Sequence, residues 1–191
     1  MKITFNKINT ISNYISFSRI LLGIPIFYFI SNINDIIGAR YILVGLYFLA
    51  YLTDLFDGYF ARKYNEISEL GKIIDPLADK ILVIMIVIYF YHFDLIPEYY
   101  FWIVVLRDLI IFTGGIFISK QIGMVLPSNY LGKGTVLSIG LFIIVVTLGI
   151  PSDDIIYTTF LSISLALSFS SVISYGIRGY REVKKVNNEA I

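Results

Sequence analysis

The sequence contains no cysteine and only one histidine, His92. Disulfides, thiolate metal sites, a cysteine nucleophile and a histidine-rich zinc centre are therefore excluded, which leaves oxygen atoms as the ligands for a metal ion. Charged residues are also scarce, at 15% of the 191 residues, and the formal net charge is only +1. Because no basic run exceeds two residues, we expect no nucleic-acid partner.

Hydrophobic residues, in contrast, make up 57% of the chain, and the mean hydropathy is +0.78. Such values lie outside the range of soluble globular domains and predict an integral membrane protein. Six apolar stretches are each long enough to cross a hydrocarbon core about 30 Å thick. The expected fold is all-α, a bundle of six transmembrane helices at residues 13–30, 36–60, 71–91, 97–119, 130–150 and 155–177.

The two ends of the chain flank this bundle. Residues 1–12 combine two lysines with scattered isoleucine and phenylalanine, a pattern that favours a short interfacial helix. The first apolar stretch lacks a small-residue cleavage site and is expected to be a retained anchor. Residues 178–191 are expected to form a cytoplasmic tail, and residues 1–191 a single membrane domain.

Four aspartates stand among these apolar segments. Asp54 and Asp57 are three residues apart, and Asp75 and Asp79 are four apart, so on helices each pair projects from one face. Carboxylates at membrane depth are costly and need a cation, a proton or a cavity. The nearby cations are too few, and all-oxygen sites select Mg²⁺, Mn²⁺ or Ca²⁺. Four carboxylates can hold two such ions about 4 Å apart, an arrangement suited to phosphoryl displacement.

Other interpretations of these residues are open. The cluster could be a structural ion-pair network or a proton pathway. Asp75 could simply cap a helix that has Pro76 in its first turn, which would leave Gly71 in a loop. A metal site instead needs a helix that begins near Gly71 and tolerates Pro76. Gly71, Asp75 and Asp79 would then share about 80° of arc.

The spacing of these residues resembles a family signature. All eight fixed positions of D-x-x-D-G-x-x-A-R-x8-G-x3-D-x3-D, the motif of the CDP-alcohol phosphatidyltransferases, are present between Asp54 and Asp79. The run Asp75–Lys80 resembles the DPxADK form of phosphatidylglycerophosphate synthases and cardiolipin synthases. Further similarity covers Asn13–Arg19, although Ser12 replaces a proline of the family pattern, and also Arg107-Asp108 and Gly132-Lys133.

This resemblance implies a two-metal transfer of the phosphatidyl group from CDP-diacylglycerol to an alcohol acceptor, with release of CMP. Asp54, Asp57 and Asp75 would be the principal ligands of two divalent cations, Mg²⁺ or Mn²⁺. Asp79 would lie near the second ion and act as general base on the acceptor hydroxyl. Gly58 and Ala61 would leave room for the cytidine, and Gly71 would let the third helix approach the nucleotide. Arg62 would contact the donor.

The acceptor is expected to be glycerol 3-phosphate. Arg107 lies near the middle of the fourth stretch and Lys133 at the start of the fifth, and together they favour a pocket for an anionic group. Alternatively, Arg107 pairs with Asp108 or with the aspartates, and Lys133 is only interfacial. The run Gly132–Thr135 lacks the second lysine of the GKxKT form of many phosphatidylglycerophosphate synthases. Phosphatidylglycerol, inositol phosphate or serine are therefore alternative acceptors.

The chain's orientation follows from its basic residues, because lysine and arginine in short loops are retained in the cytoplasm. Arg40 is the only basic residue in the opposite joints, so both termini and the aspartates are expected at the cytoplasmic leaflet of the cytoplasmic membrane. The rival functional class is a cation or proton transporter. That class predicts polar residues through the outer halves of the helices, yet residues 41–49 and 81–91 are almost purely apolar. The family resemblance also implies a homodimer in contact with membrane lipids.

Overall fold

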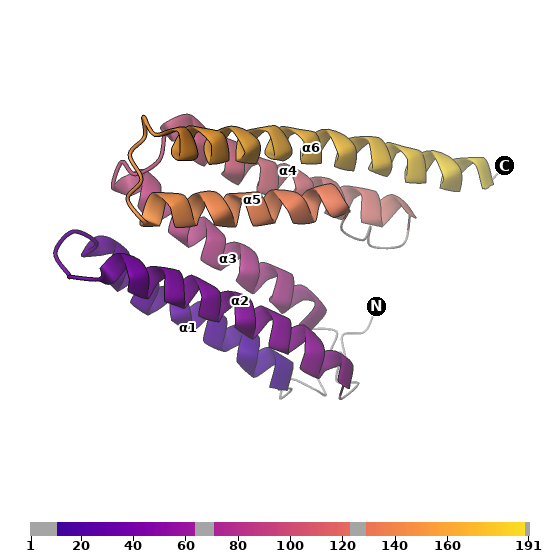
Figure 1. Ribbon diagram of the computed structural model, residues 1–191. Helices are drawn as coiled ribbons and strands as arrows, with labels where there is room; N and C mark the ends of the chain where they lie inside the picture. Colours follow the sequence, from indigo (N-terminus) through magenta and orange to yellow (C-terminus); the bar gives the residue numbers. More distant parts are fainter. Residues whose placement is uncertain (1–10, 64–70, 123–128, 190–191) are drawn as a thin grey trace. The chain divides into compact units, whose positions relative to one another are not determined.

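The computed structural model describes residues 11–63, 71–122 and 129–189 of the chain. For the helical residues 11–17, 19–20, 54–63, 71–80 and 187–189 it describes the backbone alone. The interfacial helix predicted for residues 1–12 lies outside this description up to residue 10. The all-α prediction is confirmed, because the described elements are α1 (Ile11–Ser31), α2 (Ala39–Lys63), α3 (Gly71–His92), α4 (Glu98–Ile122), α5 (Tyr130–Thr147) and α6 (Ile155–Glu189) (Figure 1).

The helices coincide with the six predicted stretches to within three residues at every end except the last, the end of α6. α2 begins at Ala39 instead of residue 36, because hydrogen-bonded turns lead into Gly38, whose φ of 81° lies in the left-handed region. α6 continues past Ile177 to Glu189, so most of the segment expected as a tail is helical. Residues 178–189 contain no proline and several good helix formers, which explains why charge does not end the helix.

The distribution of side chains suits a membrane. On α4, Leu109, Phe112 and Phe117 are exposed while Arg107 is buried, the reverse of the pattern in a soluble helix. Judged on the residues whose side chains are described, three helical segments are long and apolar enough to span a bilayer: Glu98–Ile122, Tyr130–Thr147 and Ile155–Val186. Shorter apolar segments lie at Leu21–Ser31, Ala39–Thr53 and Ile81–His92.

The chain divides into two compact units, and the first comprises Met1–Phe93. Within it, α1 packs against both α2 and α3. Gly23 of α1 allows close approach of α3, since a Cβ there would lie 2.8 Å from Met85 Cε. One turn further along, the rings of Phe27 and Tyr89 meet edge to face with centroids 4.3 Å apart. This contact holds α3 in register on α1.

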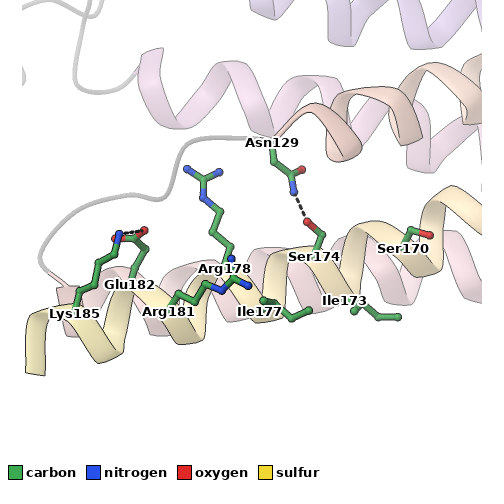
Figure 2. Close-up of a pocket in the computed structure, with 9 residues that line it drawn as sticks. All are labelled: Asn129, Ser170, Ile173, Ser174, Ile177, Arg178, Arg181, Glu182 and Lys185. Atoms are coloured by element: carbon green, nitrogen blue, oxygen red, sulfur yellow. Dashed lines mark hydrogen bonds and ion pairs between the residues drawn. The ribbon is translucent and has the colours of Figure 1, made fainter. Parts of the chain in front are cut away.

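The second unit comprises Asp94–Ile191, and in it α6 packs against α4 and α5. The buried hydroxyls of Tyr100 on α4 and Ser164 on α6 share a hydrogen bond of 2.8 Å. At the other end of the unit, Asn129 Nδ2 donates to Ser174 Oγ over 2.9 Å and ties the start of α5 to α6 (Figure 2). Hydrogen bonds thus hold the helices of this unit together at both ends. Such bonds are common in membrane proteins, because helices in lipid have no hydrophobic driving force for association.

Candidate active site

The first predicted acidic pair lies in the last turns of α2. The helix is continuous through Asp54 and Asp57 to Lys63, so the two residues occupy one face of it. Gly58 and Ala61 fall within the same arc of about 100°, and Arg62 follows. The side chains of these residues lie outside the described part of the chain, and their roles as metal and donor ligands stay predictions.

The second pair lies in the first turns of α3, and here the structure decides between two interpretations. α3 begins at Gly71, four residues before Asp75. Asp75 is therefore inside the helix, and the interpretation that it caps a helix beginning at Pro76 is wrong. Gly71, Asp75 and Asp79 consequently share one face of α3, as a metal site between α2 and α3 requires.

The fold brings the two pairs to one end of the first unit. α2 and α3 both pack on α1, and Figure 1 shows the last turns of α2 and the first turns of α3 at the same end. Among the side chains that the structure describes, no three acidic or histidine groups gather around a common point. The aspartates are outside that set, but their chemistry fits a hard divalent cation, since carboxylates are the ligands that Mg²⁺ and Mn²⁺ prefer.

Arg107 is the buried cation of the second unit. It is 7% exposed, and its neighbour Asp108 is 9% exposed. Arg107 Nη1 donates to Asp108 Oδ1, and Arg107 Nε donates to Ser171 Oγ over 3.1 Å. The ion pair of the alternative interpretation is thus present. Charge-assisted bonds of this kind offset the cost of burying a guanidinium group.

Lys133 lies in the first turn of α5 and is exposed. A Cβ built on Gly132 would lie 3.9 Å from Arg107 Nη2, so the guanidinium group reaches the turn that carries Lys133. Asn129 caps this turn by accepting a hydrogen bond of 2.7 Å from Gly132 N. The two predicted acceptor-binding residues are therefore in one neighbourhood, and their role as a phosphate pocket stays a prediction.

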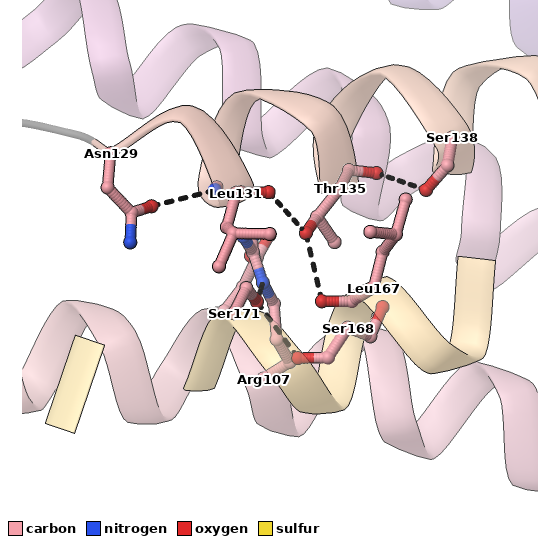
Figure 3. Close-up of polar contacts among 10 residues, drawn as sticks. Arg107, Asn129, Leu131, Thr135, Ser138, Leu167, Ser168 and Ser171 are labelled. Atoms are coloured by element: carbon pink, nitrogen blue, oxygen red, sulfur yellow. Dashed lines mark hydrogen bonds and ion pairs between the residues drawn. The ribbon is translucent and has the colours of Figure 1, made fainter. Parts of the chain in front are cut away.

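Buried hydroxyl groups lie along the contact between α5 and α6, where Ser171 also binds Arg107, and sequence analysis missed them (Figure 3). Ser171 Oγ donates to Ser168 O over 2.9 Å, while Thr135 Oγ1 of α5 bonds Leu167 O of α6 over 3.1 Å. Ser168 is 1% exposed, and in the described part of the chain its hydroxyl has no hydrogen-bond partner. The signal was the run Ser164, Ser168 and Ser171, whose spacing of four and three marks one face of an apolar helix.

Comparison with known proteins gives a consistent result. Residues 9–170 match the model of the CDP-alcohol phosphatidyltransferase family. A protein of Aquifex aeolicus named CDP-diacylglycerol–glycerol-3-phosphate 3-phosphatidyltransferase is 32% identical over 182 residues, which is 92% of this chain and 98% of that protein. A Bacillus subtilis protein of the same name is 40% identical over 88 residues, 46% of this chain and 45% of that protein. The human protein named cardiolipin synthase (CMP-forming) is 36% identical over 115 residues, 59% of this chain and 36% of that protein.

Proposed function

Because the chain belongs to the CDP-alcohol phosphatidyltransferase family, we propose that it transfers the phosphatidyl group of CDP-diacylglycerol to glycerol 3-phosphate and releases CMP. The relatives that carry this name in Aquifex aeolicus and Bacillus subtilis support the choice of acceptor. The chain is an integral membrane protein, so the acyl chains of the donor can stay in the bilayer while its head group reacts.

The reaction is a displacement at the phosphorus atom on the lipid side of the donor's diphosphate. The acceptor's hydroxyl oxygen forms a bond to this phosphorus, the bond to the CMP phosphate breaks, and CMP leaves with the electron pair. Asp79 accepts the proton of the hydroxyl group. Asp54, Asp57 and Asp75 would be the principal ligands of two divalent cations, Mg²⁺ or Mn²⁺, and Asp79 would lie near the second ion. When bound, these ions would stabilise the charge on the phosphate oxygens.

The start of α3 at Gly71 is the observation that most directly supports this proposal. It gives the helical frame in which Gly71, Asp75 and Asp79 lie on one face. Gly71, Gly58 and Ala61 have no bulky side chain, so a nucleotide has room against both helices. Arg62 follows directly in α2 and would contact the donor's phosphates.

In the second unit, Arg107 and Lys133 would bind the phosphate of the acceptor. Arg107 is held by Asp108 and by Ser171, so it needs little reorganisation to bind an anion. Lys133 is exposed on the neighbouring turn and is available for a second contact. A phosphate-bearing acceptor would gain from both, whereas an acceptor without phosphate would gain from neither.

We also propose that the chain crosses the membrane six times with both termini in the cytoplasm, and that it forms a homodimer. The basic residues at the ends of the helices support this orientation, because they gather on one side of the predicted bundle. The short apolar segments Leu21–Ser31, Ala39–Thr53 and Ile81–His92 each belong to a helix of 21 or more residues, long enough to span.

The test uses the purified full chain in detergent with CDP-diacylglycerol and a panel of acceptors, and follows CMP release. We expect release with glycerol 3-phosphate, its loss with a chelator and its return with Mg²⁺ or Mn²⁺. Phosphatidylglycerol belongs in the panel because of the similarity to the human cardiolipin synthase. If CMP is released faster with phosphatidylglycerol, then phosphatidylglycerol and not glycerol 3-phosphate is the acceptor. Full activity in the presence of chelator would contradict the two-metal mechanism.

A further inference from the structure

A groove of about 610 Å³ opens beside the last third of α6, wholly within the second unit. Figure 2 shows that its side chains come from one face of α6 and from Asn129, the cap of α5. The volume is that of a small-molecule site. The groove is far longer than the predicted phosphate pocket needs, since its lining extends along α6 from Ser170 to Lys185.

The far end of the groove is cationic. Three basic residues, Arg178, Arg181 and Lys185, and one acidic residue, Glu182, line it, which gives a formal charge of 3 − 1 = +2. Lys185 Nζ lies 3.2 Å from Glu182 Oε1, an exposed pair that contributes little stability. In the part of the chain that the structure describes, no carboxylate contacts the exposed Arg181. An anion bound here would therefore meet at least Arg181, which no described carboxylate neutralises.

The near end of the groove carries no charge and combines two exposed isoleucines with the polar residues Asn129, Ser170 and Ser174. Ile173 and Ile177 line it and are 63% and 49% exposed. The helix rises about 33 Å from Ile155 to Ile177 at 1.5 Å per residue, which matches a hydrocarbon core of about 30 Å. The two isoleucines thus lie where lipid chains end, and Arg181 and Lys185 lie one to two turns beyond, at the depth of head groups.

We propose that this groove binds one anionic phospholipid molecule. Arg181 and Lys185 would hold the phosphate of its head group, and an acyl chain would lie along Ile173 and Ile177. A zwitterionic lipid carries its own cation and gains less from a lining charge of +2, while a free phosphate gains nothing from the isoleucines. The nine lining residues that the structure describes all belong to the second unit, whereas the four aspartates belong to the first.

The test places a fluorescent reporter at the near end of the groove. The only tryptophan, Trp102, lies on α4 and is removed as Trp102→Phe, and Ile173→Trp then serves as reporter. The full chain is reconstituted in phosphatidylcholine nanodiscs that contain one tenth brominated phosphatidylglycerol or, in parallel, one tenth brominated phosphatidylcholine. We expect quenching by the brominated anionic lipid to be at least threefold greater.

Two double variants separate a built site from general surface charge. Arg181→Gln with Lys185→Gln should bring quenching by the anionic lipid down to the level of the zwitterionic lipid. The matched control, Lys120→Gln with Lys184→Gln, removes the same charge from exposed lysines outside the groove and should keep the preference. Each single variant changes one exposed side chain and is measured as well. The proposal can therefore still be tested if a double variant does not fold.

Equal quenching by the two lipids would overturn the proposal, and so would an equal loss of preference in both double variants. Quenching of the tryptophan introduced by Ile173→Trp measures lipid binding in the absence of substrates. CMP release, measured on the same preparations, reports the transfer reaction. Failure of the lipid site and failure of the proposed function are therefore distinguishable.

Discussion

Arg107 shows how one residue can be both structural and available for binding. Its guanidinium group carries five N–H donors. Asp108 and Ser171 accept two of them, and its Nη2 atom faces the first turn of α5. The orientation of Ser171 is itself fixed, because its hydroxyl donates to Ser168 O. Within the described part of the chain, Asp108 and Ser171 are the two hydrogen-bond acceptors of Arg107, so the guanidinium group is held in place while other N–H donors have no described partner.

The acceptor pocket leads to a prediction for Lys133. Lys133→Met should raise the KM for glycerol 3-phosphate roughly 10- to 150-fold, because a charge-assisted bond to phosphate contributes about 1.5 to 3 kcal/mol. The KM for CDP-diacylglycerol should stay within about threefold. Ser171→Ala should raise the acceptor KM by a smaller factor, about 5-fold, since it only loosens Arg107.

The control for this comparison is Lys120→Met, which removes an exposed cation from the last turn of α4 and should leave both KM values unchanged. The measurement is steady-state CMP release with each substrate varied in turn. If Lys133→Met leaves the acceptor KM unchanged, the phosphate is bound elsewhere or the acceptor carries none.

Asp79 and Asp54 are predicted to differ in role although both are carboxylates. Asp79→Asn should lower turnover by about 10²- to 10⁴-fold while CDP-diacylglycerol binding stays nearly intact, because it removes the base that takes the acceptor's proton. Asp54→Asn should weaken both, because it removes a metal ligand. Binding of the donor is measured by equilibrium titration without acceptor, and turnover by CMP release. Equal loss of donor binding in the two variants would make Asp79 mainly a metal ligand.

At the scale of elements, Asn129 joins two helices through one side chain. Its Oδ1 atom caps α5 at Gly132 N, and its Nδ2 atom donates to Ser174 Oγ of α6. Asn129→Ala should lower the free energy of unfolding by about 1 kcal/mol or somewhat more, since it loses the cap as well as the link. Denaturation in mixed detergent micelles, followed by circular dichroism, measures this change.

Asn129→Asp is the matched variant for this prediction. It keeps an oxygen acceptor for the cap and adds a negative charge at the start of α5, which the helix dipole favours. It loses the donor to Ser174. We expect a loss of less than about half that of Asn129→Ala. A loss as large as that of the alanine variant would mean that the link to α6, and not the cap, is the dominant contact.

The elements themselves could be predicted closely from the sequence, because apolar runs between turn residues set the helix bounds. The end of α6 could not, since a change from apolar to charged residues marks the membrane surface and not the end of the helix. For the same reason the groove beside Arg181 and Lys185 could not be predicted. The start of α3 was undecided, because Asp75 before Pro76 suits both a helix cap and a helix interior near its first turn.

The candidate site was predictable only in part. The spacing of Asp54, Asp57, Asp75 and Asp79 defines two helix faces without any knowledge of tertiary contacts. The partners of Arg107 depend on how α4 and α6 pack, because Ser171 is 64 residues away along the chain. Periodic serines in α6 signal a polar face, but not which cation of another helix that face contacts.

At the scale of the whole molecule, exposure and charge both support a location in the membrane. Many large apolar side chains are exposed on the described helices, and the proposed topology puts the basic residues of the sequence, with one exception, on one side of the membrane. Arg40 is the exception near the opposite ends, and its Nη2 atom lies 3.4 Å from Asn34 Oδ1, an amide of the same joint. A single arginine of this kind does not outweigh the bias set by the other cations.

The six-span topology is tested most directly with single cysteines, because the chain has none of its own. Asp35→Cys in the first unit and Ser152→Cys in the second both place a thiol at an exposed joint between helices. Asp94 is less suited, because its φ of 54° is strained for cysteine. We expect both thiols to react with an impermeant reagent added outside intact cells, since the joints face away from the basic residues.

Lys184→Cys, also exposed, is the control and should react only after the cells are opened. Reaction of Lys184→Cys in intact cells would reverse the orientation. Reaction of only one of the two joints would mean that the chain crosses the membrane an odd number of times between them, instead of the four times proposed.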